Sequence, residues 1–299
     1  MTDTARTKGA FPSAGEDATV ALKVEKTPQT ASPSYRLAYN DDDFLMRDEL
    51  RPVRLQLELL KPELVQQDHA IEATVVVFGS SRLVDADVAQ QKLAAAKERL
   101  AADPDNAQLA RRVETAERRL RNAVYYDEAR RLGTLITEQS GAIGKERLYV
   151  VTGGGPGIME AANRGANDCG GKSIGLNIVL PTEQVPNPWI TPELTFQFHY
   201  FAIRKLHFLL RARALVAFPG GFGTMDELFE TLTLIQTGKI KPVPVLLFGR
   251  EHWERAIDFD WLIEQGMIAE GERNLFHYVE SAEEAWQRIL AFYSDDDAS

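Results

Sequence analysis

Glu227 ends a glycine-rich stretch with the sequence Pro219-Gly-Gly-Phe-Gly-Thr-Met-Asp-Glu227. The apolar run from Ala214 to Phe218 predicts a strand buried on both faces, and the pattern from Thr224 onward predicts an amphipathic helix. The three glycines of the intervening turn let the backbone approach a ligand closely. Because the first N–H groups of a helix have no partner inside it, the turn predicts a phosphate site with a carboxylate one helical turn away.

Two interpretations of Glu227 are open. Thr224 and Glu227 fit the T-x-x-E capping box, in which the glutamate only bonds back to the backbone N–H of the threonine. A plain cap does not require a Pro-Gly-Gly turn before it, and this turn favours a glutamate that faces a ligand. Spacing alone does not choose between the two.

Arg204 and Lys205 are adjacent in a largely apolar segment, residues 199–210, that predicts a helix. Two neighbouring cations cannot both be buried there without anionic partners. Arg204 therefore either pairs with a structural carboxylate or contacts the ligand. We expect His199 and His207, in the same segment, to be core residues or to lie behind the site rather than to act as bases.

Two further glycine-rich turns follow predicted strands. Gly79-Ser-Ser follows the apolar run from Thr74, and Gly153-Gly-Gly-Pro-Gly157 leads from another run into a helix. Each turn can present backbone N–H groups to an anion. No acidic residue ends the next strand to bind a ribose diol, so NAD binding is disfavoured. Arg82 either supplies a cation to a phosphate or lies in solvent, and solvent is the expectation for an isolated arginine.

Three of these features resemble the LOG-like phosphoribohydrolases, also called the lysine-decarboxylase-like Rossmann family. They are the PGGxGTxxE stretch that ends at Glu227, the run GGGPGIMEAAN from Gly153, and the pair Arg204-Lys205 fifteen residues before Pro219. The resemblance extends from about Thr74 to Tyr293, apart from an insertion. It implies that Arg204 and Glu227 are catalytic.

The resemblance also implies a reaction. A nucleoside 5'-monophosphate, either AMP or a cytokinin riboside 5'-monophosphate, would be hydrolysed at its N-glycosidic bond to free base and ribose 5-phosphate. Glu227 would stabilise an oxocarbenium-like transition state or direct the attacking water. Arg204 would hold phosphate or ribose oxygens and keep Glu227 ionised by lowering its pKa. The alternative is a nucleotide-binding or sensor protein without turnover.

The expected substrate-binding residues come from the three turns and their flanks. They are Gly79, Ser80, Gly153, Gly154, Gly155, Gly157, Met159, Lys205, Gly220, Gly221, Gly223 and Thr224. We expect no metal, because no group of His, Cys and carboxylate residues has ligand spacing. We also expect no cofactor, since no site for pyridoxal phosphate is recognisable.

Predicted strands and helices alternate along the chain, which predicts an α/β fold with a doubly wound, mostly parallel, Rossmann-like sheet. About seven strands are expected, at 74–78, 148–152, 172–180, 194–198, 214–218, 243–248 and 276–279. The carboxyl ends of such strands meet where the strand order reverses, so the three glycine turns should surround one crevice. The proline-rich loop 181–188 could cover a ligand there.

Several segments lie outside this core. Residues 1–35, rich in Thr, Ser, Ala and Pro, are predicted to form a disordered arm, and 36–299 a single domain. Within it, 41–67 is helical, and a helical hairpin is inserted at about 86–121, with a break at Ala102-Asp-Pro-Asp-Asn106 and a second limb that continues to about residue 139.

The composition limits the partners. With 299 residues, 44% of them hydrophobic, the chain can bury a large core. Its net charge of −10 argues against nucleic acid as a partner, and no apolar run is long enough to span a membrane. A single cysteine, Cys169, agrees with a cytoplasmic location. The family resemblance suggests a homodimer or higher homo-oligomer.

Overall fold

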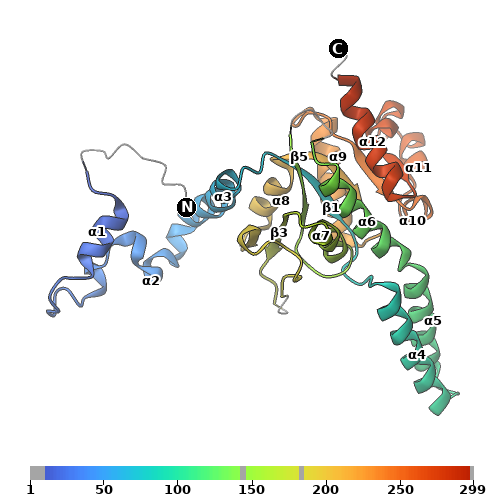
Figure 1. The fold of residues 1–299 in the computed structure, drawn as a ribbon, viewed down its shortest axis with the longest axis horizontal. Coiled ribbons are helices and arrows are strands. Elements are labelled where there is room, and N and C mark those ends of the chain that lie inside the picture. Colours follow the sequence, from blue (N-terminus) through green and yellow to red (C-terminus); the bar gives the residue numbers. More distant parts are fainter. Residues whose placement is uncertain (1–10, 142–145, 182–184, 297–299) are drawn as a thin grey trace. The chain divides into compact units, whose positions relative to one another are not determined.

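The structure is a computed structural model that describes residues 11–141, 146–181 and 185–296 (Figure 1). The chain forms two compact units, Met1–Leu57 and Glu58–Ser299. The boundary lies inside helix α3 (Arg51–Asp68) and not near residue 35, where we placed the end of the arm.

The first unit contains more helix than its composition indicates. Helix α1 (Ala14–Ala21) lies within the segment predicted to be a disordered arm, and that prediction is wrong for these residues. Ser13 and Glu16 form a capping box, in which each side chain accepts a hydrogen bond from the backbone N–H of the other. None of the residues of α1 is buried, so local capping rather than a core favours this helix. Residues 1–10 of the predicted arm lie outside the described part of the chain.

The second unit is built on a seven-stranded, all-parallel sheet, as predicted. The strands are β1 (Ala73–Phe78), β2 (Leu148–Thr152), β3 (Ser173–Ile178), β4 (Thr195–Phe198), β5 (Ala212–Ala217), β6 (Val245–Phe248) and β7 (His277–Val279). Their order across the sheet is β4-β3-β2-β1-β5-β6-β7. The chain therefore builds outward from β1 to one edge, returns to β5 beside β1, and builds to the other edge.

Helices cover both faces of the sheet (Figure 1). They are α6 (Val124–Glu138), α7 (Ile158–Asp168) and α12 (Ala282–Asp296) on one face, and α8 (Phe201–Leu209), α9 (Phe222–Gln236), α10 (Arg250–Ala256) and α11 (Phe259–Glu264) on the other. Side chains of β1 alternate between the two cores: Val75 and Val77 lie in the first, and Val76 and Phe78 in the second.

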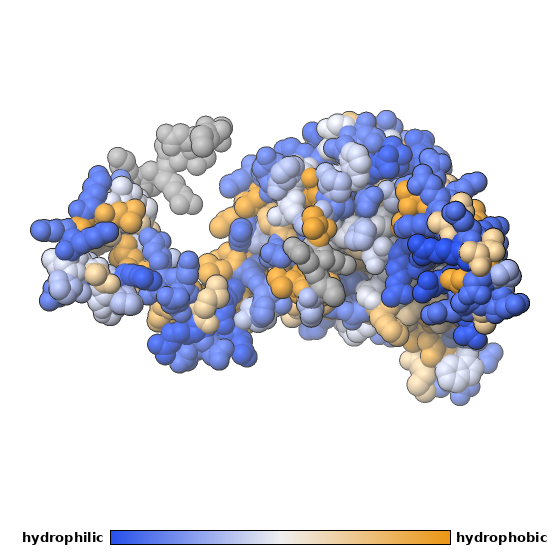
Figure 2. All heavy atoms as spheres, turned by 90° about the horizontal axis from the view of Figure 1, so that it is seen from below, coloured by the Kyte–Doolittle hydropathy of each residue, from blue (hydrophilic) through white to orange (hydrophobic). Residues whose placement is uncertain are grey.

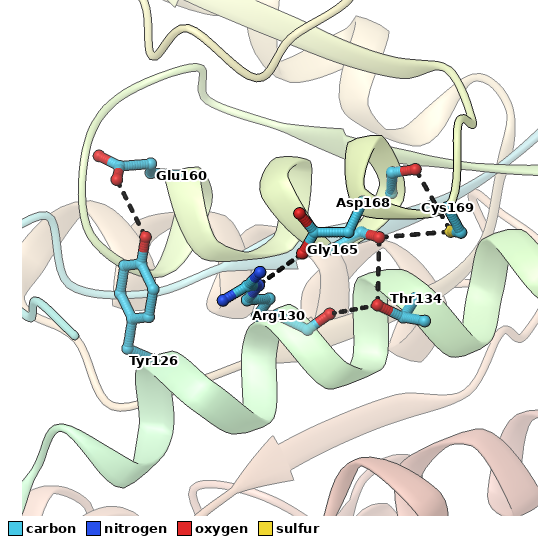
Figure 3. A network of polar contacts seen from close by, with 8 residues as sticks. Tyr126, Arg130, Thr134, Glu160, Gly165, Asp168 and Cys169 are labelled. Atoms are coloured by element: carbon cyan, nitrogen blue, oxygen red, sulfur yellow. Dashed lines mark hydrogen bonds and ion pairs between the residues drawn. The ribbon is translucent and has the colours of Figure 1, made fainter. Parts of the chain in front are cut away.

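Helices α6 and α7 lie against each other (Figure 3). A side chain at Gly165 of α7 would collide with the backbone carbonyl of Arg130 on α6, so glycine permits this close approach. Arg130 also pairs with Asp168, and the hydroxyl of Tyr126 donates a hydrogen bond to Glu160 at 2.9 Å (Figure 3). These contacts hold α7 along its length, and the one from Tyr126 lies at its start, next to the glycine turn that precedes this helix.

The inserted hairpin consists of α4 (Ala86–Ala102) and α5 (Ala107–Arg121). Asn106 caps α5 through hydrogen bonds from the N–H groups of Gln108 and Leu109, which explains the break at 102–106. The second limb does not continue to residue 139, because α5 ends at Arg121 and α6 begins separately at Val124. The hairpin is therefore α4 and α5, and α6 belongs to the cover of the sheet.

The surface is predominantly hydrophilic on the face seen in Figure 2, and its apolar residues form separate patches. Among the helices in the described ranges, none has the length and apolarity that a membrane span requires.

Candidate active site at the strand-order reversal

Strands β1 and β5 lie side by side at the point where strand order reverses. The segments that follow the two strands remain paired. The N–H of Ser80 donates to the carbonyl of Pro219, and the N–H of Phe218 donates to the carbonyl of Phe78. The Gly79 and Gly220 turns therefore open side by side, as the sheet topology predicted.

The turn after β5 is shorter than predicted. Helix α9 begins at Phe222, with Gly221 at its N-cap, and the N–H of Met225 already donates to the carbonyl of Gly221. Thr224 is thus inside the first turn and cannot cap the helix. The capping-box interpretation of Glu227 is wrong, because Glu227 stands in the second turn of α9.

A cavity of about 690 Å³ opens at this point. It collects ten of the residues that sequence reasoning placed in the site: Gly79, Ser80, Gly153, Met159, Arg204, Gly220, Gly221, Gly223, Thr224 and Glu227. These residues come from the ends of three strands and from the starts of α7, α8 and α9. Residues far apart in the sequence thus share one cavity, which is of the size that small-molecule sites occupy.

Four predicted residues are not among the residues that line this cavity: Gly154, Gly155, Gly157 and Lys205. The carbonyl groups of Gly154 and Gly155 accept hydrogen bonds from Asn187. Gly157 has φ +77° and lies against the carbonyl of Ser80, where an added side chain would collide. These three glycines shape the turn and leave Gly153 as its residue that faces the cavity.

Arg204 is held from behind. Its Nε donates to the carbonyl of Leu176 at 2.7 Å, and its guanidinium lies over the ring of Phe208 at 5.2 Å. The Nη2 atom of the guanidinium lies beside Gly153 at the cavity wall. Burial lowers the pKa of Arg204, whereas the charge of Glu227 raises it. Since arginine stays protonated in proteins, the cavity contains a half-buried positive charge.

Glu227 is 7% exposed and lies near four other charged side chains. Lys205 Nζ is 3.9 Å from Glu227 Oε2, and it is closer to Asp226 and Glu230, at 2.8 and 3.0 Å. Burial raises the pKa of Glu227 to about 7, although Lys205 and Arg204 both lower it. We expected Arg204 to hold this pKa low. Arg204 does lower it, as expected, but loss of hydration outweighs the two cations, so the pKa is not held low.

Sequence reasoning missed several residues of the cavity wall. His252 from α10 lies beside Gly220, and burial lowers its pKa. Because α10 follows the carboxyl end of β6, the neighbour of β5, its position in the sheet was the available signal. Asn122, which follows the inserted hairpin, carries no comparable signal. The aromatic rings of Phe201 and Phe222 also line the cavity, and Phe222 is 94% exposed.

Arg82 lines the cavity and is also exposed to solvent. Its position therefore fits both alternatives, contact with a ligand phosphate and exposure to solvent. Across the described residues, no three His, Cys, Asp or Glu side chains gather where they could hold a metal ion. The charged groups that line the cavity are Arg82, Arg204, Asp226 and Glu227.

Comparison with known proteins places the chain in a family. A family model described as possible lysine decarboxylase matches residues 159–289. The cytokinin riboside 5'-monophosphate phosphoribohydrolase LOG1 of Arabidopsis thaliana is 30% identical over 171 residues, which cover 55% of this chain and 75% of LOG1. The chain belongs to the LOG-like family of phosphoribohydrolases.

Other relatives within the LOG-like family match a smaller share of their own length. The cytokinin riboside 5'-monophosphate phosphoribohydrolase LOG of Oryza sativa subsp. japonica is 30% identical, over 55% of this chain and 65% of the relative. LOG5 of Arabidopsis thaliana is 26% identical, over 49% and 64%. The alignments thus span just under two thirds of these two relatives.

Among solved structures, the Moco carrier protein from Chlamydomonas reinhardtii is 19% identical, with a TM-score of 0.41, over 74% of this chain and 98% of that protein. A likeness at this level has no bearing on the activity of this member of the LOG-like family.

Proposed function

We propose that this protein hydrolyses the N-glycosidic bond of a nucleoside 5'-monophosphate, AMP or a cytokinin riboside 5'-monophosphate, to free base and ribose 5-phosphate. The observation that carries this proposal is that Glu227 and Arg204 line one cavity at the start of α9. The relatives named as cytokinin riboside 5'-monophosphate phosphoribohydrolases support it.

The phosphate is expected at the start of α9. The N–H groups of Phe222, Gly223 and Thr224 occupy the first helical positions, where the helix offers them no acceptor, and the helix dipole favours an anion there. Arg204 lines the same cavity and would hold phosphate or ribose oxygens. Arg82 at the mouth provides a second cation.

Bond cleavage is assigned to Glu227. As the base leaves, positive charge develops on the ribose, and an ionised carboxylate beside it stabilises that charge or orients the attacking water. Because burial disfavours the carboxylate anion, a developing cation next to it is stabilised more strongly here than in water. Water supplies the hydroxyl group of ribose 5-phosphate, and the leaving base takes up the proton.

The base is expected on the apolar side of the cavity. Phe201, Phe222 and Met159 line it. Aromatic rings can stack on a flat heterocycle, and a thioether adapts to its edge. This lining is compatible with a purine base. It does not discriminate between adenine and isopentenylated adenine.

The experiment is a panel of nucleoside 5'-monophosphates, including AMP and its isopentenyl derivative, incubated with the protein and analysed for free base by chromatography. We expect base release from at least one member, and none above background with Glu227→Ala. Binding of AMP without base release from any member would contradict hydrolysis and leave a nucleotide-binding protein.

We also infer that the chain assembles as a homodimer or higher homo-oligomer. A groove of about 1290 Å³ lies beside α8, and its lining includes Leu206 and Leu210, which are 43% and 48% exposed. Burial of these leucines against a second copy would remove apolar surface from water. Light scattering coupled to size-exclusion chromatography tests this, and a monomeric mass would contradict it.

A further inference from the structure

Helix α3 lies outside the segment 159–289 that matches the family model, yet its second half contacts the helix that carries Arg204. The carboxylate of Glu58 on α3 accepts hydrogen bonds from the backbone N–H groups of His199 and Tyr200, at 2.8 and 3.1 Å. These two residues immediately precede α8. Glu58 therefore binds the N-terminal end of the helix from another element of the fold.

Helix α8 lacks a cap of its own. Tyr200 occupies its N-cap position and makes no side-chain capping bond to any described residue. The N-terminal end of a helix has unpaired N–H groups and a positive dipole end, both of which a carboxylate stabilises. Glu58 places a negative charge at this end of α8 and holds the backbone of His199 and Tyr200, the two residues that lead into the helix.

Arg204 depends directly on this end of α8. The N–H of Arg204 donates to the carbonyl of Tyr200 at 3.2 Å, so Arg204 closes the first turn of the helix. Tyr200 thus connects the two residues: its N–H donates to Glu58, and its carbonyl accepts from the N–H of Arg204. A shift of this turn would move the guanidinium relative to the cavity.

A second contact fixes the opposite end of the helix. Glu63 of α3 forms a bidentate pair with Arg211, at 2.6 and 2.7 Å, and Arg211 Nε also donates to the carbonyl of Ile71. Arg211 follows α8 and stands seven residues after Arg204. This pair anchors α8 to α3 without touching the first turn, and it provides a matched control.

Between the two carboxylates, Pro62 on α3 is buried, and so is His207 on α8. Proline has no N–H, so the carbonyl of Glu58, four residues earlier, lacks its usual partner within the helix. His207 lies against the backbone of Glu58 and Leu59, although neither of its ring nitrogens reaches hydrogen-bonding geometry with a described residue. The second half of α3 thus contacts α8 or its flanking residues at Glu58, Leu59 and Glu63.

We propose that Glu58 is a positioning residue for Arg204: its carboxylate fixes the first turn of α8 and thereby sets where the guanidinium meets the substrate. The proposal rests on the proposed function, in which Arg204 holds phosphate or ribose oxygens. It assigns to α3, an element outside the matched family segment, a part in the geometry of the site.

The test compares Glu58→Ala, Glu58→Gln and Glu63→Gln in the full chain. For each variant, kcat and KM for AMP are measured as a function of pH, AMP affinity is measured by calorimetry, and stability by thermal unfolding. Glu58→Ala should lower kcat/KM about tenfold or more, because both acceptors of the turn are lost. Glu58→Gln, which keeps one amide oxygen, should recover part of that loss.

Glu63→Gln should affect stability more than activity. It breaks a half-buried ion pair, so its melting temperature should fall further than that of Glu58→Ala, while kcat/KM stays within about threefold of wild type. Since Glu58 does not touch the reacting atoms, the pH at which the rate of Glu58→Ala is half-maximal should match wild type.

Two outcomes would overturn the proposal. One is a kcat/KM for Glu58→Ala within twofold of wild type. The other is an equal loss of activity in Glu58→Ala and Glu63→Gln that follows their loss of stability. If wild type releases no base from any nucleoside 5'-monophosphate of the panel, the proposed function fails, whereas the affinity of Glu58→Ala for AMP still decides whether Glu58 positions Arg204.

Discussion

Glu227 is subject to two opposing influences. Its burial disfavours the anion, while Lys205 and Arg204 favour it, and burial prevails. A carboxylate with a pKa of about 7 is half ionised near neutral pH, which is unusual for an exposed glutamate but common at sites that do chemistry. The consequences can be measured in the pH dependence of the rate and of the stability.

The rate should rise with pH. If the ionised carboxylate is the active form, kcat/KM for AMP is low when Glu227 is protonated and increases through a midpoint of about 7. The measurement is kcat/KM between pH 5 and 9, with Glu227→Gln as the control that should lack this dependence. A rate that falls as pH rises through 7 would assign Glu227 the role of a proton donor instead.

Stability should move in the opposite direction. The folded-state pKa lies above the usual value of 4.5, so the folded protein favours the protonated form, and the stability contributed by that proton is lost as pH rises from about 4.5 through 7. The loss is on the order of 3 kcal/mol. Glu227→Gln should therefore be more stable than wild type at pH 8 and nearly equal at pH 5.

Urea unfolding at both pH values measures this difference. A Glu227→Gln variant that is less stable than wild type at pH 8 would show that Lys205 and Arg204 compensate the buried charge more fully than the pKa indicates.

Lys205 is expected to tune Glu227 rather than to bind substrate. Its ammonium is paired with Asp226 and Glu230 and does not face the cavity. In Lys205→Met, a charge that lowers the pKa of Glu227 is removed, so the midpoint of the rate profile should move above 7. KM for AMP, measured at high pH, should change by less than about threefold. A large rise in KM with an unmoved midpoint would restore Lys205 as a substrate ligand.

At the scale of elements, the strands were predictable because each is a short apolar run followed by glycine, proline or a polar turn. The first residues of helices were harder to predict from the sequence. Phe222 and Gly223 were assigned to the turn, since glycine and an exposed aromatic ring do not indicate a helix start, yet both lie in α9. At Ser13 a helix start was overlooked. Its four-residue capping box favours a helix inside a stretch whose composition is typical of disorder.

The contact between α6 and α7 gives a prediction of its own. In Gly165→Ala the new methyl group would meet the carbonyl of Arg130, and the two helices must separate, at a cost of about 1–3 kcal/mol. Gly15→Ala is the matched control, because Gly15 also lies in a helix but has open space around it. Chemical denaturation should show Gly165→Ala destabilised and Gly15→Ala unchanged or slightly more stable. Equal stability of the two variants would contradict the close packing.

At the scale of the whole molecule, the parallel topology decides where the site lies. The position of the cavity followed from the alternation of strands and helices, which places all carboxyl ends at one edge of the sheet. Residues such as Gly153 and Arg204 could be assigned because local motifs mark them. Asn122 and Glu58 could not, since each reaches its place through contacts between elements far apart in the sequence.

The central claim is that Glu227 and Arg204 together cleave the bond between base and ribose. The most direct measurement is the simultaneous quantification of free base and ribose 5-phosphate at pH 8, from the nucleoside 5'-monophosphate of the panel that is cleaved fastest, for wild type and Glu227→Gln. The account predicts equal amounts of both products with wild type and a rate at least about a hundredfold lower with Glu227→Gln. Equal rates for the two proteins, or free base without ribose 5-phosphate, would contradict it.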